Sequence, residues 1–235
     1  MGSKAIMSWS GGKDSVMALY EVQRSDAYEI QGFLTTITRD YDRVCMHGVR
    51  TALLEQQAAA LGFPLDKIYL APNEPQQGYE TKMQAYLARG RDRDIQAVIF
   101  GDLFLRDVRQ YREWNLSKAG MQAVFPLWGQ DTRDLAERFQ RIGFQAIVTC
   151  VDRHALTPGF VGRRYDPAFL TDLPPAADPC GERGEFHSFV YDGPLFQRPV
   201  LFRTGRTLVR ENRFAYLDLF PSVSPRGIER VTKGR

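Results

Sequence analysis

The sequence predicts an α/β fold in which a five-stranded parallel sheet carries helices on both faces. Short apolar segments alternate with longer amphipathic segments over the first 125 residues, which is the pattern of parallel strands joined by crossover helices. The run Ala-Val-Ile-Phe at 97–100 is continuously apolar, as in a strand buried on both faces. Short loops and right-handed crossovers leave few topologies, and by analogy with other doubly wound sheets we expect the strand order 3-2-1-4-5.

The individual elements follow from the spacing of apolar residues and from the positions of glycine and proline. Strands are expected at 5–9, 30–37, 67–71, 97–100 and 123–125. The polar segment 38–48 between the second strand and the next helix is expected to be a loop. Helices are expected directly after the first strand, over 49–61, 79–88 and 105–119, and from a cap at Asp131 or Thr132 to Ile142.

The pattern restarts after Trp128, and we place a domain boundary there. Residues 1–128 would form the first domain, and residues 129–235 a smaller α+β domain. In the second domain, 144–151 is expected to be a strand. The segment 157–179 holds five prolines and is expected to be extended loop or short helices.

Composition and charge exclude some classes of protein and leave others open. The chain is 43% hydrophobic and 25% charged, which is ordinary for a soluble globular protein, and its net charge of +3 argues neither for nor against a nucleic-acid partner. No apolar run approaches the roughly 20 residues that span a bilayer, and the early first strand leaves no room for a signal peptide. The widely spaced Cys45, Cys150 and Cys180 fit a reducing compartment, so we expect a cytoplasmic protein.

A glycine-rich turn between the first strand and the first helix is the clearest candidate site. This glycine loop consists of Ser10, Gly11, Gly12, Lys13, Asp14 and Ser15. The glycines let the backbone approach a ligand, and the helix start favours an anion. With two hydroxyl donors and a lysine, the loop suits a polyphosphate; a capped helix without a ligand is the alternative. A Walker A loop is excluded because Met7 stands where it needs glycine, and the chain has no Gly-x-Gly-x-x-Gly here.

A second group follows the fourth strand, whose carboxyl end should face the same crevice. Gly101 and Asp102 begin this group, and Asp102 is either a helix cap or a contact for a ribose hydroxyl, a metal or the adenine region. Arg109 and Arg112 stand three residues apart, with Tyr111 between them. They form either a solvated basic helix face or a holder of substrate or nucleotide phosphates.

Two weaker candidates follow the second strand. Thr36 lies at its end and His47 lies in the loop after it, which should overhang the crevice. Both could contact the nucleotide base. A histidine in a loop is otherwise often only a polar surface group.

The second half contains one dense group of reactive side chains at 178–188, Asp-Pro-Cys-Gly-Glu-Arg-Gly-Glu-Phe-His-Ser. Acids and an imidazole this close together can serve proton transfer or ammonia handling. A glycine-punctuated turn with incidental charges is the plainer interpretation. A zinc site would use Cys150, His154, Cys180 and His187, but neither pair has a strong zinc spacing.

These segments together resemble the diphthine–ammonia ligase family of PP-loop ATP pyrophosphatases, also described as adenine nucleotide alpha hydrolase-like. The glycine loop matches the superfamily, and the blocks at 101–113, 125–129 and 178–196 match the family. The last block is the most specific, and the resemblance spans residues 4 to about 196. The segment 43–49 matches only loosely and resembles a shorter variant of the family's loop.

The resemblance implies a Rossmann-like, HUP-type PP-loop domain that binds ATP with Mg²⁺. It implies an AMP-forming ligase that adenylates a substrate carboxylate and then amidates it with ammonia. Lys13 and Asp14 would act in catalysis, with Asp14 also helping to place the metal. The acceptor and ammonia side would be lined by Cys180, Gly181, Glu182, Glu185 and His187, of which Glu182, Glu185 and His187 would be catalytic.

Two other classes of function stay open. The second class is an RNA-modifying enzyme, because other PP-loop proteins resemble tRNA thiolases or lysidine synthases. A thiolase would need a pair of cysteines that forms a persulfide. A nucleotide sensor without turnover is the third class, and the acids at 178–188 argue against it. The sequence identifies neither the acceptor, which would not be diphthine in a bacterium, nor the nitrogen donor, nor the oligomeric state. Six arginines near the end of the sequence could follow the phosphates of an RNA or form a solvated basic tail: Arg203, Arg206, Arg210, Arg213, Arg226 and Arg230.

Overall fold

A computed structural model describes residues 2–45 and 47–222 of the chain. The first half is built on a six-stranded sheet, and its five parallel strands confirm the predicted order, here β4-β2-β1-β5-β6. The sixth strand, β3, pairs antiparallel with the end of β2. The strands are β1 (Ser3–Ser8), β2 (Tyr28–Thr38), β3 (Arg43–Val44), β4 (Leu65–Leu70), β5 (Ala97–Ile99) and β6 (Gln122–Val124).

The segment 38–48 differs from the predicted loop. It contains a 3-10 turn, η1 (Arg39–Tyr41), and the short strand β3. Strand β2 continues beyond the end of β1, so the edge it leaves open is free to pair with Val44 and Arg43. The Cys45 N–H continues this attachment by donating to the Thr36 carbonyl at 3.1 Å.

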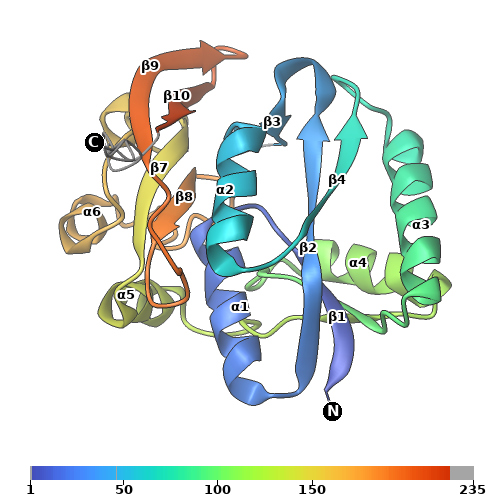
Figure 1. The fold of residues 1–235 in the computed structure, drawn as a ribbon. Coiled ribbons are helices and arrows are strands. Elements are labelled where there is room, and N and C mark those ends of the chain that lie inside the picture. Colours follow the sequence, from blue (N-terminus) through green and yellow to red (C-terminus); the bar gives the residue numbers. More distant parts are fainter. Residues whose placement is uncertain (1, 46, 223–235) are drawn as a thin grey trace, which may run out of the picture.

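Four helices cover the two faces of this sheet. Helices α1 and α2 lie on the face toward the second half of the chain, and α3 and α4 lie on the opposite face (Figure 1). Alternation along β1 explains the division, because Ala5 and Met7 pack in the cluster with α1 and α2 whereas Ile6 packs in the cluster with α3 and α4. The helices are α1 (Lys13–Ser25), α2 (Thr51–Leu61), α3 (Gln76–Asp92) and α4 (Arg106–Lys118).

The second half forms a four-stranded antiparallel sheet in the order β8-β7-β10-β9. Asp131 caps α5 by accepting the backbone N–H groups of Arg133 and Asp134, as predicted, and Gly143 ends the helix at φ 97°. The segment 178–188 is a turn only as far as Glu185, because β8 begins at Phe186. The elements are α5 (Thr132–Ile142), β7 (Gln145–Asp152), η2 (Pro158–Phe160), α6 (Pro167–Asp172), β8 (Phe186–Asp192), β9 (Phe202–Arg210) and β10 (Phe214–Pro221).

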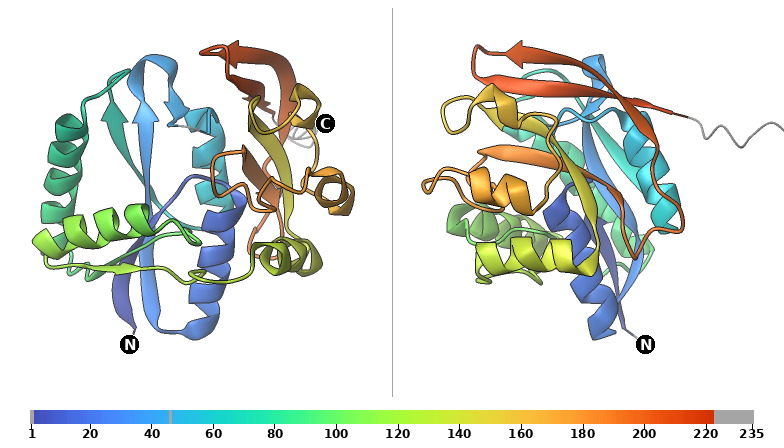
Figure 2. Two further views of the ribbon diagram at one scale, coloured as in Figure 1. Left: turned by 180° about the vertical axis from the view of Figure 1, so that it is seen from behind. Right: turned by 90° about the vertical axis from the view of Figure 1, so that its left-hand side faces the viewer.

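The two halves are packed against each other through α1 and α2, which lie between the two sheets (Figures 1 and 2). One buried apolar cluster runs from β1 through these helices to β7 and β8. A domain boundary near Trp128 stays a prediction. Within the described ranges no helix is both long and apolar enough to cross a membrane. Arg203, Arg206 and Arg210 lie on β9 and Arg213 follows it, whereas Arg226 and Arg230 lie outside the described residues.

Candidate functional site

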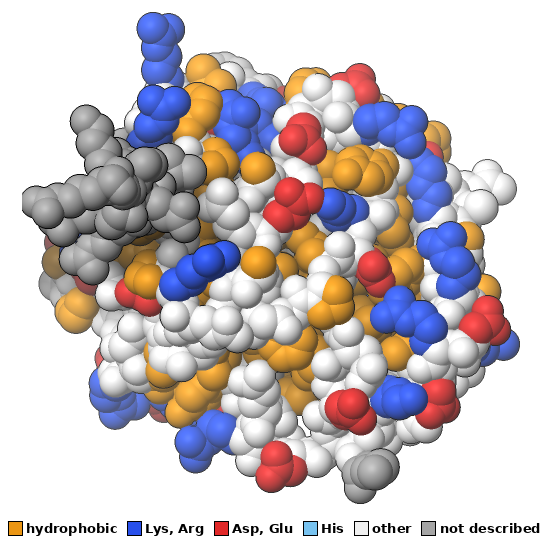
Figure 3. All heavy atoms as spheres, in the orientation of Figure 1, with side chains coloured by type: hydrophobic (Ala, Val, Ile, Leu, Met, Phe, Trp, Pro, Cys, Tyr) orange, Lys and Arg blue, Asp and Glu red, His pale blue; other side chains and the backbone are white. Residues whose placement is uncertain are grey.

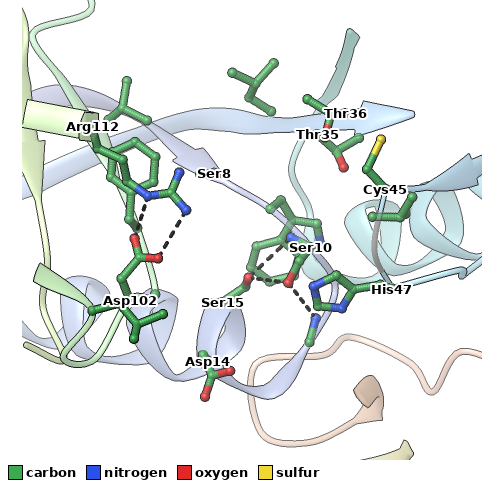
Figure 4. A pocket seen from close by; sticks show the side chains of 18 of the residues that line it. Ser8, Ser10, Asp14, Ser15, Thr35, Thr36, Cys45, His47, Asp102 and Arg112 are labelled. Carbon is green, nitrogen blue, oxygen red and sulfur yellow. Dashed lines mark hydrogen bonds and ion pairs between the residues drawn. The ribbon is translucent and has the colours of Figure 1, made fainter. Parts of the chain in front are cut away.

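A cavity of about 420 Å³ opens at the carboxyl ends of β1, β2 and β5. Both halves of the chain line it: the glycine loop and the segments after β2 and β5 from the first half, and residues 181–188 from the second. Figure 4 shows part of the wall, with Ser10, Ser15 and His47 close together and Asp102 beside Arg112 on another side. The structure therefore contains a cavity at the predicted crevice between the first and fourth strands.

The glycine loop is held in shape by its own hydroxyl groups. The hydroxyl oxygens of Ser10 and Ser15 are 2.9 Å apart, and the Gly12 N–H donates to Ser10 Oγ at 3.2 Å. Gly11 has φ 78°, which glycine adopts without strain. The backbone N–H of Lys13, the first residue of α1, donates to Ser188 Oγ on β8 at 3.2 Å. Gly12 and Lys13 therefore line the cavity at the start of α1, where the helix dipole favours an anion.

Gly101 packs directly against this loop. A Cβ added to Gly101 would lie 2.8 Å from both the backbone carbon and the backbone oxygen of Asp14, and 3.0 Å from the backbone nitrogen of Ser15. These are backbone atoms, which cannot rotate away as a side chain can. The end of β5 and the start of α1 can approach this closely only because residue 101 has no side chain.

Lys13 is the buried cation of the cavity. Its ammonium lies 2.9 Å from Asp14 Oδ2, and its side chain is 5% exposed. The ammonium also lies 5.1 Å from the centre of the Phe186 ring. Burial lowers the pKa of Lys13, but Asp14 and the other acidic groups around it outweigh that effect and raise the pKa above its ordinary value. The lysine is therefore positively charged at neutral pH.

Asp102 forms an ion pair with Arg112 across the cavity wall. The Arg112 Nε lies 2.7 Å from one carboxylate oxygen of Asp102, and Arg112 Nη2 donates to the other at 3.1 Å. The guanidinium lies 4.2 Å from the centre of the Phe100 ring. Helix α4 begins after Leu105 with no side-chain cap, so the interpretation of Asp102 as a helix cap is wrong.

Glu182 is the acidic group of the second half that faces the cavity. Its Oε1 accepts the backbone N–H of Leu103 at 2.8 Å, which joins the 178–188 segment to the loop after β5. Burial raises the pKa of Glu182 to about 7, aided by the nearby carboxylates of Asp14 and Asp102 and opposed by the Leu103 hydrogen bond and Lys13. A carboxyl group with this pKa exchanges its proton near neutral pH.

Two histidines stand together above the glycine loop. The rings of His47 and His187 are 4.4 Å apart at their centres, although 140 residues separate them in the sequence. Burial and the charge of Lys13 lower the pKa of His187 to about 4, and burial, His187 and Lys13 hold the pKa of His47 well below its ordinary value. Both imidazoles are therefore neutral at pH 7. The Nδ1 atom of His47 is buried and finds no hydrogen-bond partner among the described residues.

The cavity also has an apolar part between the sheet and the helices α3 and α4. Leu34, Val98 and Phe100 from the sheet face Met83 and Leu116 from the helices. The polar groups of Tyr79, Glu80, Gln84, Tyr111 and Asn115 border the same space. The sequence did not identify the residues of α3, because nothing local distinguishes them from any other helix over a sheet. This part offers a flat apolar group a place next to the glycine loop.

Most of the predicted residues line the cavity, and four do not. Arg109 pairs with Glu113 at 2.7 Å and stacks over Trp128, so it faces away from Arg112. Glu185 is buried, and its carboxylate accepts the backbone N–H groups of Asp178 and Arg183. The predicted roles of Arg109 in substrate binding and of Glu185 in catalysis find no support in this geometry. Outside the cavity lie Gly11, Arg109, Cys180 and Glu185; around it lie Ser10, Gly12, Lys13, Asp14, Ser15, Thr36, His47, Gly101, Asp102, Tyr111, Arg112, Gly181, Glu182 and His187.

The donor set suits a magnesium ion held with phosphate oxygens better than a metal held by protein alone. Within residues 2–45 and 47–222, no three His, Cys, Asp or Glu side chains form a cluster that could hold a metal ion, which rules out the considered zinc site there. Asp14 Oδ1 is buried without a hydrogen-bond partner among the described residues, at the start of α1. A single free carboxylate oxygen is what Mg²⁺ uses when phosphate oxygens and water complete its shell.

Glu182 gives a testable link between pH and stability. Its pKa is about 7 in the folded chain against 4.5 in a model peptide, so between these values the folded state binds more protons and stability falls as the pH rises. We expect the free energy of unfolding of Glu182→Gln, relative to that of the wild type, to rise by about 2 kcal/mol from pH 5 to pH 8. This is less than the full pKa shift implies, because the side chain keeps some contact with solvent. Urea unfolding at both pH values measures this. The exposed Glu137→Gln is the control, and parallel curves for Glu182→Gln and the wild type would contradict it.

Comparison with known proteins agrees with this arrangement. Residues 3–123 match the family described as Diphthamide synthase N-terminal domain, and residues 131–215 match the Diphthamide synthase C-terminal domain. The chain belongs to the diphthamide synthase family. The family resemblance of the sequence is thereby confirmed. In this family's terms, the glycine loop lies in the N-terminal diphthamide synthase domain and Glu182 in the C-terminal one.

One curated relative of the diphthamide synthase family carries a name that states an activity. The protein named diphthine–ammonia ligase from Bos taurus is 26% identical over 147 residues, which cover 56% of this chain and 55% of the bovine protein. The chain therefore matches about half the length of that relative.

Proposed function

We propose that this chain is an ATP-dependent, AMP-forming ligase that joins ammonia to a substrate carboxylate. The carboxylate attacks the α-phosphorus of ATP, which breaks the bond to the β-phosphate and releases pyrophosphate. Ammonia then attacks the acyl carbon of the resulting acyl-adenylate and displaces AMP. The observation that carries the proposal is that the glycine loop and the acidic 178–188 segment line one cavity in a chain of the diphthamide synthase family. The name of the bovine relative supports the same chemistry.

In this proposal, the phosphates of ATP lie against the glycine loop. The backbone at Gly12, the Ser10 and Ser15 hydroxyls and the Lys13 ammonium supply donors and positive charge to them. The adenine fits the apolar part between β2, β5 and α3, with Thr36 and His47 at its edge. Magnesium would neutralise part of the charge of the phosphates, and Asp14 is the residue that would hold it.

The acceptor would bind to the groups opposite the glycine loop. Arg112 can orient a carboxylate, and Tyr111 borders the same wall. Glu182, with a pKa of about 7, can take a proton from ammonium and so leave ammonia free to attack. His187 is neutral, and its imidazole can form a hydrogen bond with ammonia in the same cavity.

The RNA-modifying alternative has less support. On the face drawn in Figure 3, the basic side chains of the described residues are interspersed with acidic ones rather than gathered into one patch. A thiolase needs reactive thiolates, whereas burial raises the pKa of Cys150 to about 12 and the pKa of Cys180 further. Full activity of Cys150→Ser and Cys180→Ser would exclude the thiolase. A cytoplasmic location belongs to the main proposal and rests on three free cysteines.

The deciding experiment follows the fate of ATP. The chain is incubated with ATP, Mg²⁺, ¹⁵N-ammonium and a protein bearing diphthine, chosen because the bovine relative is named for it. We expect AMP and pyrophosphate in equal amounts and one ¹⁵N in the acceptor, with hydroxylamine trapping the activated carboxylate when ammonium is omitted. Formation of ADP and phosphate would refute the ligase. Tight ATP binding with no AMP after hours, across several carboxylate acceptors, would favour the sensor.

A further inference from the structure

We propose that Gln57 is a positioning residue that holds the glycine loop in the shape that binds phosphate, an inference that rests on the proposed binding of ATP. Gln57 lies on α2, outside the cavity, and its side chain is fully buried. Its Nε2 donates to the carbonyl oxygens of Gly11 at 2.9 Å and of Val190 at 2.6 Å. Its Oε1 accepts the indole N–H of Trp9 at 2.8 Å. One side-chain amide therefore joins the end of β1, the glycine loop and β8.

The orientation of this amide is fixed by its partners. The indole of Trp9 can only donate, and the carbonyls of Gly11 and Val190 can only accept, so a reversed amide would lose all three hydrogen bonds and leave the Trp9 N–H without its acceptor. Each unsatisfied buried group would cost a desolvation penalty. Gln57 therefore has one orientation, and it holds Gly11 in place.

The fixed carbonyl of Gly11 sets the direction of the next N–H group. The Gly11 oxygen accepts the N–H of Val190 at 3.0 Å as well as the amide of Gln57, so it points away from the cavity. In a trans peptide the carbonyl and the following N–H point in opposite directions. The Gly12 N–H is thereby turned toward the cavity side, where it reaches Ser10 Oγ. A donor for phosphate is oriented from behind by a residue that never touches the ligand.

The packing around Gly11 leaves the loop little freedom to absorb a change. A Cβ at Gly11 would lie 2.5 Å from Leu54 Cδ1 and 2.8 Å from Gln57 Oε1. Both of these side chains come from α2. A displacement of the Gln57 amide is therefore transmitted to the loop backbone.

Two substitutions of Gln57 test this role, with a matched control one residue away. Gln57→Met keeps the length and removes the amide, and Gln57→Glu makes a carboxylate face two carbonyl oxygens. We expect each to raise the Kd for ATP with Mg²⁺ at least tenfold at pH 8 by calorimetry, at a temperature where circular dichroism shows the folded state. Gln56→Glu, at an exposed position on the same helix, should bind like the wild type. At pH 5.5 the new carboxyl group of Gln57→Glu is protonated and regains one donor. The affinity of this variant for ATP should therefore recover in part, relative to that of Gln56→Glu. The affinity of Gln57→Met should not recover.

The outcomes separate this inference from the proposed function. If the wild type does not bind ATP, the proposed function fails and the inference with it. If the wild type binds and a folded Gln57 variant binds within twofold of it, the inference alone fails. Should neither variant fold, the side-chain amide signal of Gln57 in the wild type decides by NMR: ATP should slow the exchange of its hydrogens, and unchanged exchange would overturn the inference.

Discussion

Lys13→Met is expected to lower the rate of AMP formation about 10²–10³-fold, as removal of one preorganised charge or donor does in other active sites. The Lys13 ammonium is buried in the cavity wall at the glycine loop, and its pKa lies above its ordinary value, so it carries a full positive charge where the phosphates would lie. Methionine keeps the length and the apolar stem but brings no charge. Because the lost charge would act on the phosphates in both the ground and transition states, the Kd for ATP should rise as well. Pyrophosphate release and calorimetry measure the two effects.

The control for this change is an exposed lysine on the neighbouring strand β1. Lys4 lies on β1 with 40% of its side chain exposed, 3.7 Å from the carboxylate of Asp94. Lys4→Met should leave turnover unchanged, since exposed ion pairs contribute little. A Lys13→Met chain that melts cooperatively and retains a third or more of wild-type turnover would show that the buried ammonium does not act on the phosphates.

Gly101→Ala is expected to weaken ATP binding at least tenfold and to destabilise the fold by about 1–3 kcal/mol, the usual cost of overpacking. The new methyl carbon would stand 2.8 Å from the carbonyl carbon and oxygen of Asp14, closer than carbon contacts allow. The end of β5 and the start of α1 must then separate, which moves the loop that would hold the phosphates. Thermal unfolding and ATP calorimetry measure the two consequences.

A second glycine provides the matched control. A Cβ at Gly159 would meet nothing nearer than Thr157 Oγ1 at 3.9 Å, so Gly159→Ala should change neither quantity. If Gly101→Ala bound ATP as tightly as Gly159→Ala, the close approach of β5 to the loop would be irrelevant to binding.

The parallel sheet could be predicted because its signals are local. Strand β5 is a short apolar run between helices, the right-handed crossover rule leaves few topologies, and analogy with other doubly wound sheets then selects the observed order. Strand β3 could not be predicted, because two residues carry no periodicity and pair only where β2 extends past β1. The start of β8 at Phe186 was hidden by the charged residues before it, which are typical of a turn.

The part of the candidate site that lies in one contiguous motif could be predicted. The parts formed by residues far apart in the sequence could not. The glycine loop is contiguous, so its place followed from the strand before it and the helix after it. The contact of His47 with His187 depends on the packing of two sheets and has no counterpart in local spacing. Arg109 and Arg112 share a helix face in sequence, yet the ring of Trp128 holds one and the carboxylate of Asp102 holds the other. Gln57 has no motif at all, because its three partners are 46 to 133 residues away.

The hydrogen bond from Val190 to the Gly11 carbonyl makes β8 and the glycine loop one mechanical unit. A molecule that binds the antiparallel sheet and shifts β8 would pull on the loop through this bond, so its binding and that of the proposed nucleotide would be thermodynamically linked. Such coupling is reciprocal: if the acceptor tightens ATP binding by some factor, ATP tightens acceptor binding by the same factor. The order in which the two arrive then affects the rate of assembly but not the stability of the assembled complex.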